Sequence, residues 1–202
     1  MSRISAVVFD FGQVLVHWDP TAVWEGELSR QEALTALEEA DFFAVNRRLD
    51  AGARWADVRG EHEARVGERV QVVDRYLQDF PRSLVRPMEG MEALVRDLQH
   101  AGIRTLGLTN WSAETFHHAP DVVPAIALME DVVVSGQVKL AKPDPAIYTL
   151  MLDRFGLDPA QTAFVDDSPP NVDAARALGI RAEVFTGADE WRAALRRWGV
   201  AV

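Results

Sequence analysis

The 202-residue sequence contains no cysteine. This absence excludes disulfide-stabilised scaffolds, metal sites built from thiolates and enzymes with a cysteine nucleophile. It leaves the cellular compartment open, although a reducing one fits, and we expect a cytoplasmic protein. Catalytic groups and metal ligands must therefore come from oxygen and nitrogen side chains.

Long apolar runs and basic residues are also scarce. No uninterrupted apolar stretch approaches the roughly 18 residues of a membrane-spanning helix, and the first ten residues lack the apolar segment of a secretory signal. Asp and Glu number 31 against 21 Lys and Arg, which gives a formal net charge of -10. We therefore expect neither a membrane nor a nucleic acid as a partner, and an anionic substrate would need a local positive site.

What is present is an ordinary globular composition, with 48% hydrophobic and 26% charged residues. Apolar runs typical of buried strands alternate with amphipathic segments typical of helices. The expected strands are residues 6–9, 103–108, 131–134, 163–165 and 182–185, and the expected helices are residues 89–100, 145–155 and 171–178. Strand, helix and strand in repetition imply right-handed crossovers, so the sequence predicts an α/β fold with a parallel sheet.

Residues 19–86 depart from this alternation and show helical periodicity without a convincing buried strand. The expected helices are residues 29–40, which a capping box opens, residues 53–66 and residues 70–80, and the clearest turn is Asp50 to Gly52. We predict that residues 19–86 form a helical cap. It is inserted after the first strand of an α/β core that comprises residues 1–18 and 87–202.

Polar side chains follow three of the expected strands. Asp10 follows the first, Thr109 and Asn110 follow residues 103–108, and Asp166 and Asp167 follow residues 163–165. The carboxyl ends of parallel strands lie at one edge of the sheet, where open α/β folds bind their ligands. A single aspartate at such a place is often a turn or cap residue, but three strand ends together predict a site.

Adjacent carboxylates such as Asp166 and Asp167 are costly unless a cation or hydrogen bonds compensate their charge. Together with Asp10 they form a set of hard oxygen ligands suited to Mg²⁺. The alternative is that the pair caps the helix that follows, and it is weaker because Asn171 is itself a good cap. Lys142 lies in a proline-rich turn that could aim its ammonium group at a bound phosphate, whereas we expect Lys139 at the surface.

Four segments resemble, in order and context, the motifs of the haloacid dehalogenase (HAD) superfamily. They are FDFGQVL at residues 9–15, LTN at 108–110, KPDPAIY at 142–148 and FVDDS at 164–168. The resemblance implies a hydrolase with a Rossmann-like core, and the helical insert is similar to the small cap of the subclass I branch.

The resemblance also implies a role for each matching residue. Asp10 would be the nucleophile that forms an aspartyl-phosphate. Thr109 and the amide of Asn110 would hold the transferring phosphoryl group, while Lys142 would screen charge between nucleophile and phosphate. These roles require a small phosphorylated substrate.

The same resemblance implies Mg²⁺ as the cofactor. Its ligands would be Asp10, the backbone carbonyl of Gly12 and Asp167, with Asp166 bound to the metal directly or one layer behind it.

The sequence departs from the family pattern at Gly12. Most phosphatases of the superfamily carry there a second aspartate that protonates the leaving oxygen and then activates water. A positioned acid or base contributes roughly 100-fold to 10,000-fold. His17 and Asp19 are candidates to replace it, directly or through water, but the favoured interpretations are that His17 packs at the cap hinge and that Asp19 caps a helix.

The departure leaves several activities open. Glycine at this place resembles the alpha-D-glucose 1-phosphate phosphatase-like branch, whose anomeric leaving oxygen is comparatively acidic, so we predict a phosphatase with a sugar phosphate as a plausible substrate. A 2-haloacid dehalogenase, in which halide leaves without a proton, comes second, and a non-catalytic phosphate-binding module third. Phosphonatase chemistry needs a cap lysine, and residues 19–86 contain none.

Substrate selection would fall to the cap turn at residues 49–54, where Arg54 could bind a sugar or a second phosphate. Trp18, Trp24 and Trp55 could form a stacking wall, although tryptophans in a small helical bundle are more often core residues. The apolar C-terminal segment, Trp191–Val202, is expected to dock on the sheet or to form a dimer contact. We therefore expect a monomer or a homodimer.

Overall fold

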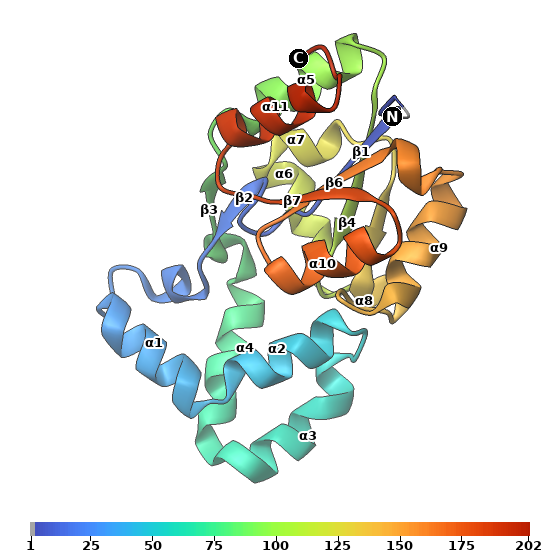
Figure 1. The fold of residues 1–202 in the computed structure, drawn as a ribbon. Coiled ribbons are helices and arrows are strands. Elements are labelled where there is room, and N and C mark those ends of the chain that lie inside the picture. Colours follow the sequence, from blue (N-terminus) through green and yellow to red (C-terminus); the bar gives the residue numbers. More distant parts are fainter. Residues whose placement is uncertain (1–2) are drawn as a thin grey trace.

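The computed structural model describes residues 3–202, so residues 1 and 2, the first two of the predicted core, lie outside the described residues. Its centre is a five-stranded sheet with the strand order β5-β4-β1-β6-β7, and every neighbouring pair in it is parallel (Figure 1). The strands are β1 (Ala6–Phe9), β4 (Arg104–Thr109), β5 (Val132–Val134), β6 (Thr162–Asp166) and β7 (Arg181–Val184). The predicted α/β fold with a parallel sheet is confirmed.

The central strand β1 is apolar throughout because helices cover both faces of the sheet. Val7 and Phe9 belong to one buried cluster, and Ala6 and Val8 belong to another on the opposite face. The first cluster includes residues of α5 (Met91–His100) and α11 (Ala188–Arg197), and the second includes residues of α9 (Pro145–Phe155) and α10 (Pro169–Ala177). The buried strand therefore places Asp10 at the carboxyl edge of the sheet.

Helix boundaries follow local capping signals. Helix α9 has the predicted bounds because Asp144 caps its start and Gly156 adopts the left-handed conformation after its end. Helix α10 begins two residues earlier than predicted, at Pro169. Proline is tolerated in the first turn of a helix because the N–H that it lacks has no partner within the helix there. Ser168 is then the N-cap residue, and the side chain of Asn171 is available for another contact.

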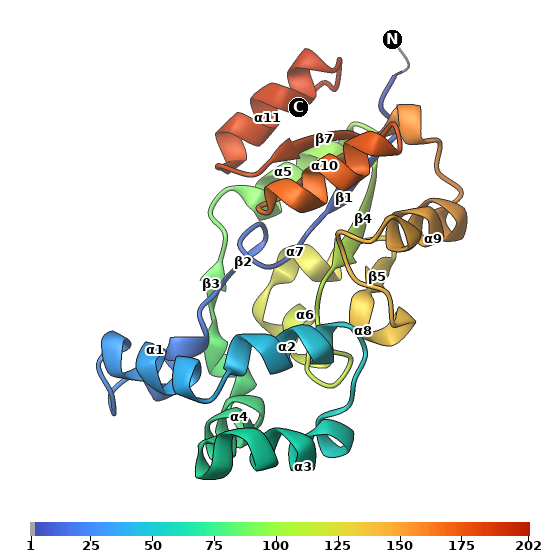
Figure 2. The ribbon, with the colours of Figure 1, turned by 60° about the horizontal axis from the view of Figure 1, so that its bottom comes forward.

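The four α-helices within residues 30–78 form a bundle beyond the carboxyl edge of the sheet, and we call them the cap helices (Figures 1 and 2). They are α1 (Arg30–Glu39), α2 (Phe42–Asp50), α3 (Trp55–Val66) and α4 (Val70–Gln78), with short 3₁₀ turns at Pro20–Trp24, Gly67–Arg69 and Phe80–Ser83. Helix α2 was not predicted. Asp41 takes left-handed dihedrals between α1 and α2, where a glycine or asparagine would have marked the break.

Two short strands connect the core to the cap helices. β2 (Val16–Trp18) and β3 (Leu84–Pro87) form an antiparallel pair, so the two crossings of the chain lie side by side. The sequence showed no convincing buried strand in residues 19–86, and β3, most of which falls at their end, is largely exposed. Residues 85–87 are exposed, so this strand lacks the buried apolar pattern by which strands were identified. The division into core and cap at residues 18 and 87 stays a prediction.

The remaining elements are short, apart from the C-terminal helix. They are the turns Phe116–His118 and Pro159–Gln161 and the helices α6 (Ala119–Val122), α7 (Pro124–Ala127) and α8 (Ser135–Val138). Trp191 and Leu195 of α11 are buried in the cluster that contains α5, which is the expected docking of the C-terminal segment. Across residues 3–202, the helices are all too short or too polar to cross a bilayer.

Candidate active site

Three strand ends meet at the carboxyl edge of the sheet. Because β1 lies between β4 and β6, Asp10 has Thr109 on one side and Asp166 on the other. Asp10, Thr109 and Asp166 are all buried. The structure thus brings together the polar groups that the sequence placed after separate strands.

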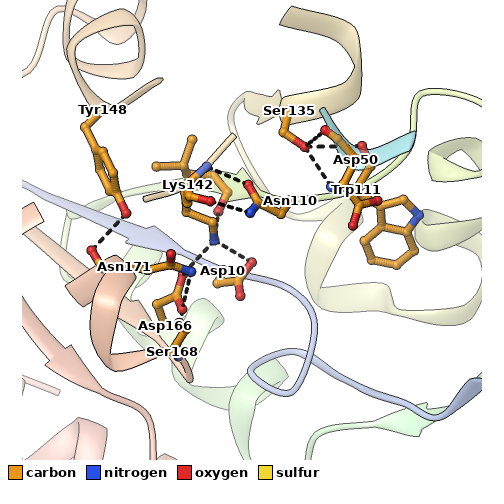
Figure 3. A network of polar contacts seen from close by, with 11 residues as sticks. Asp10, Asp50, Asn110, Trp111, Ser135, Lys142, Tyr148, Asp166, Ser168 and Asn171 are labelled. Atoms are coloured by element: carbon orange, nitrogen blue, oxygen red, sulfur yellow. Dashed lines mark hydrogen bonds and ion pairs between the residues drawn. The ribbon is translucent and has the colours of Figure 1, made fainter. Parts of the chain in front are cut away.

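Lys142 lies at the centre of this group (Figure 3). Its Nζ is 2.8 Å from Asp10 Oδ1 and 2.6 Å from Asp166 Oδ2, and it donates a hydrogen bond of 2.9 Å to the carbonyl of Leu108. The side chain is only 1% exposed. A single buried ammonium therefore links the ends of three neighbouring strands.

Burial and charge act in opposite directions on these groups. Burial alone would lower the pKa of Lys142, but the charges of Asp10 and Asp166 outweigh it and raise that pKa, so the amine stays a cation. Burial raises the pKa of Asp10 to about 7, against the opposing charge of Lys142 and with a further contribution from Asp166. The site is short of positive charge.

Asp166 is saturated with hydrogen-bond donors. Its Oδ1 accepts from the backbone N–H of Ser168 at 2.8 Å and from Asn171 Nδ2 at 2.9 Å, and its Oδ2 accepts from Lys142. The carbonyl of Asn171 accepts a hydrogen bond from the Tyr148 hydroxyl at 2.8 Å, which ties α10 to α9 (Figure 3). Asp166 therefore positions Lys142, while its neighbour Asp167 is exposed.

The three carboxylates fit a divalent cation by their chemistry. Oxygen atoms from Asp10, Asp166 and Asp167 lie within 4.8 Å of one another. Three carboxylates against one ammonium leave an excess of two negative charges, and burial together with the charge of Asp166 raises the pKa of Asp167. Hard oxygen ligands with this excess charge match the preferences of Mg²⁺.

The end of β4 offers an uncommitted donor. Thr109 Oγ1 is buried and has no hydrogen-bond partner within residues 3–202. Buried hydroxyls are normally paired, so this one is suited to an oxygen atom of a ligand. The side chain of Asn110 is differently used: its Nδ2 donates to the Lys142 carbonyl at 2.9 Å and its Oδ1 accepts from the Lys142 N–H at 2.8 Å.

A cavity of about 80 Å³ lies between this edge and the cap helices. Gly12 and Asn110 line it from the core, and Asn46 and Asp50 line it from α2. Its aromatic walls are Trp18, Tyr76, Phe80 and Trp111. The lining combines apolar rings with a few polar groups, as the linings of binding sites for small molecules do.

A family model for haloacid dehalogenase-like hydrolases matches residues 4–179 of the chain. The chain belongs to the haloacid dehalogenase-like hydrolase family. The expected superfamily is thereby confirmed, and the protein is a hydrolase.

Relatives of this HAD-like hydrolase include named phosphatases. It is 26% identical over 179 residues to a sesquiterpene phosphatase of Aspergillus oryzae, covering 89% of this chain and 88% of that one. It is 29% identical over 201 residues to a phosphoglycolate phosphatase of Rhodospirillum rubrum, covering 90% and 79%. Another relative is much longer: the chain spans 35% of a drimenol cyclase of Aspergillus calidoustus, at 25% identity.

Solved structures share the fold. A HAD family enzyme of Bacteroides thetaiotaomicron in complex with magnesium and inorganic phosphate superimposes with a TM-score of 0.72 at 20% identity, covering 95% of this chain and 98% of that one. An L-2-haloacid dehalogenase of Xanthobacter autotrophicus superimposes with a TM-score of 0.65 at 18% identity, covering 98% and 85%. Likeness at this identity shows the fold of the HAD-like hydrolase, not its substrate.

The turn after α2 joins the cap helices to the core of the HAD-like hydrolase. Ser135 Oγ, at the end of β5, donates to the Asp50 carbonyl at 2.5 Å and accepts from the Trp111 N–H at 2.9 Å (Figure 3). Gly52 has a φ of +95°, and a Cβ there would lie 2.7 Å from Cγ of Lys139. The turn is thus closely packed on the core, and the role of residues 49–54 in substrate selection stays a prediction.

The Asp50 carboxylate is enclosed in this turn. Its Oδ2 accepts from Asn46 Nδ2 at 3.0 Å, and the carboxylate also accepts from the backbone N–H of Ser112. Burial raises the pKa of Asp50 from 3.8 to about 7, Ser112 opposes the rise and the charge of Asp10 adds to it. The HAD-like hydrolase therefore holds a cap carboxylate that titrates near neutrality.

This raised pKa predicts a pH-dependent stability. Between about pH 4 and 7 the folded protein binds a proton at Asp50 that the unfolded chain has released, so stability falls as the pH rises through this window. We expect Asp50→Asn to raise the free energy of unfolding by on the order of 2–4 kcal/mol at about pH 8 and to leave it nearly unchanged at about pH 4. Urea denaturation at both pH values measures the difference, and equal effects would contradict the prediction.

The other predicted residues lie away from the cavity. His17 and Asp19 line a separate groove near the β2–β3 pair. Asp19 caps the 3₁₀ turn that begins at Pro20, and hydrogen bonds from Thr21 with the charge of Arg30 outweigh its burial and lower its pKa. Arg54 is exposed at the start of α3 and does not line the cavity.

Two of the three tryptophans proposed as a stacking wall have structural contacts instead. Trp18 lines the cavity and donates a 3.0 Å hydrogen bond from Nε1 to the Tyr76 hydroxyl. Trp24 is buried in the core, and Trp55 donates from Nε1 to Asp74 Oδ1 at 2.8 Å. Of the three, Trp18 alone borders the cavity of the HAD-like hydrolase in the described part of the chain.

Proposed function

We propose that this HAD-like hydrolase is a magnesium-dependent phosphatase that cleaves a small phosphorylated metabolite through an aspartyl-phosphate on Asp10. One observation carries the proposal: the buried Asp10 pairs with Lys142, belongs to a cluster of carboxylates, and ends the strand next to that of Thr109, whose hydroxyl has no partner among the described residues. A carboxylate nucleophile, a cation and a free donor are the groups that phosphoryl transfer through a covalent intermediate requires.

The reaction has two displacements. A carboxylate oxygen of Asp10 attacks phosphorus, the bond from phosphorus to the ester oxygen breaks, and the leaving oxygen takes a proton. Water then attacks the phosphorus of the aspartyl-phosphate, releasing inorganic phosphate and the Asp10 carboxylate. Lys142 offsets negative charge beside the nucleophile, and Thr109 Oγ1 with the backbone N–H of Asn110 would donate to phosphoryl oxygens.

Asp10, Asp167 and the Gly12 carbonyl would hold Mg²⁺, with Asp166 behind them because its oxygens already accept hydrogen bonds from Lys142, Ser168 and Asn171. When bound, the ion supplies the positive charge that the three carboxylates and a phosphate dianion need. The complex of the Bacteroides thetaiotaomicron enzyme with magnesium and inorganic phosphate supports this assignment by analogy.

A sugar phosphate is the substrate class that we favour. The aromatic rings around the cavity could stack on a sugar, while Asn46 and Ser112 offer polar groups for its hydroxyls. The lack of a carboxylate at Gly12 agrees with the branch similar to alpha-D-glucose 1-phosphate phosphatases, whose leaving oxygen is easier to expel. The subclass I cap assignment belongs to the same proposal.

Dehalogenation is less well supported. Expelling halide from a haloacid produces no phosphate-like charge and gives no reason for a cluster of three carboxylates around the nucleophile. The fold of the Xanthobacter autotrophicus enzyme is shared, but so is that of the magnesium and phosphate complex. The carboxylate cluster therefore favours the phosphatase.

The test measures phosphate release from sugar 1-phosphates, sugar 6-phosphates and phosphoglycolate, with Mg²⁺ and with a chelator. We expect release with Mg²⁺ and a loss of at least about 100-fold in chelator, restored by added Mg²⁺. Halide release from 2-chloropropionate, with no phosphate release, would replace the phosphatase by the dehalogenase. Mg²⁺ and inorganic phosphate binding without any turnover would identify a binding module.

A further inference from the structure

The proposed function leaves one proton without a carrier. Expelling an alkoxide from a phosphate ester is slow unless a group protonates the leaving oxygen, and Gly12 cannot do so. His17 and Asp19, the two sequence candidates, line the other groove, and Asp19 is held by Thr21 and Arg30. The remaining candidates are the side chains that line the cavity.

The cavity offers two titratable side chains, Asp50 and Tyr76. Burial raises the pKa of Tyr76, so its hydroxyl is a poor base, and this hydroxyl already accepts a hydrogen bond from Trp18. Asp50 is the one carboxylate among the residues that line the cavity, within the described part of the chain. The candidates thus reduce to Asp50.

We propose that Asp50, supplied by the cap, is the catalytic acid and base of this hydrolase in place of a carboxylate at position 12. In the first displacement the protonated Asp50 gives its proton to the leaving oxygen. In the second, the Asp50 carboxylate takes a proton from the attacking water and is ready for the next cycle. The proposal rests on the proposed phosphatase function.

The contacts of Asp50 tie it to the segment that follows β4. The backbone N–H that binds its carboxylate belongs to Ser112, three residues beyond Thr109, and the other donor is Asn46 of α2. The Ser135 hydroxyl donates a hydrogen bond to the backbone carbonyl of Asp50 and accepts one from the N–H of Trp111. The segment that presents the phosphate-binding residues of β4 therefore also positions Asp50.

The charges around Asp50 suit a group that changes protonation in each cycle. Asp10 disfavours its ionised form from the core, Ser112 favours it, and Tyr76 contributes a neutral hydroxyl. Lys139 packs against Gly52, two residues from Asp50 in the sequence, but the Lys139 side chain is exposed to solvent. A carboxyl group with a pKa of about 7 is protonated and ionised in comparable amounts at neutral pH, as both displacements require.

Gly12 provides a way to test the substitution. Gly12 lines the same cavity, a Cβ built on it meets nothing within 4 Å, and its backbone is outside the left-handed region. A side chain therefore fits at position 12. An aspartate placed there should take over the proton transfer when Asp50 is removed.

The experiment compares Asp50→Asn with the wild type on two substrates. The first is the best sugar phosphate of the panel, and the second is acetyl phosphate, whose acetate leaves without a proton. We expect kcat/KM for the sugar phosphate to fall roughly 100-fold to 10,000-fold. The single-turnover rate of acetate release should change less than about tenfold, because that step needs no acid.

The variants Gly12→Asp/Asp50→Asn and Asp19→Asn complete the test. The double variant should recover at least about tenfold of the lost sugar-phosphate activity, and Asp19→Asn should match the wild type. In the wild type, the single-turnover rate of sugar-phosphate cleavage should decline as the pH rises above about 7, because Asp50 then loses its proton. The rate of Asp50→Asn should not show this decline.

Two results would overturn the proposal. Sugar-phosphate turnover within tenfold of wild type in Asp50→Asn would show that Asp50 carries no proton. An equal loss on both substrates, without rescue by Gly12→Asp, would assign Asp50 a structural role. Either result leaves the phosphatase proposal intact, because that proposal fails only if the wild type releases no phosphate.

Discussion

Asp10→Asn is expected to reduce phosphate release by a factor of about 10⁴ or more. The amide is a poor nucleophile, so the first displacement has no attacking group and no aspartyl-phosphate forms. The backbone position of residue 10 should not change, because its N–H is held by the Val165 carbonyl at 2.9 Å. Phosphate release and intact-mass spectrometry of acid-quenched enzyme, which detects the phosphoryl adduct, measure the two expected losses.

Asp131→Asn is the matched control for this variant. Asp131 also lies next to a strand of the α/β sheet, but its side chain is at the protein surface. It pairs there with Arg154, and both side chains are 44% exposed. We expect its activity to equal that of the wild type. A phosphoryl adduct that persists in Asp10→Asn would show that another residue is the nucleophile.

Lys142→Met is expected to destabilise the fold by about 3–5 kcal/mol, the largest stability effect that we predict. Methionine has a similar length, but it leaves Asp10 and Asp166 buried without the cation that now lies within 2.8 Å of both. Protonating a carboxylate relieves such a site, so the loss should be smaller at about pH 5 than at about pH 8. Urea denaturation at the two pH values measures the effect.

Lys139→Met is an internal control because it makes the same substitution three residues away. Lys139 is exposed, and we expect a change within about 0.5 kcal/mol. If Lys142→Met lost the same free energy at both pH values, packing rather than charge would be responsible. Activity should fall in Lys142→Met under every condition that leaves it folded, because the charge beside the nucleophile is gone.

Much of the site could be predicted because it depends on strand topology and local signals. Three short apolar runs ending in Asp10, Thr109 and Asp166 are readable in the sequence, and parallel pairing brings such ends together without further information. Helix α9 was equally readable, since Asp144 and Gly156 mark its ends. The roles of these residues came from resemblance and stay predictions until the variants are measured.

The parts that were missed depend on contacts between distant segments. Ser135 follows the strand β5, so the same strand-end rule could have singled it out, but its partner Asp50 lies 85 residues away. Asp50 was visible only as a turn residue. Its enclosure by Asn46 and Ser112, which raises its pKa, exists only once α2 has packed on the core.

The β2–β3 pair limits how the cap helices can move. Both crossings of the chain are hydrogen-bonded into one ribbon, so bending at this ribbon would swing α1 to α4 together rather than one helix at a time. The far end of α2 lies beside α8, where Ser135 holds the Asp50 carbonyl (Figure 2). Breaking that hydrogen bond would free this end of α2, so Asp50 would leave the core together with the other cap helices.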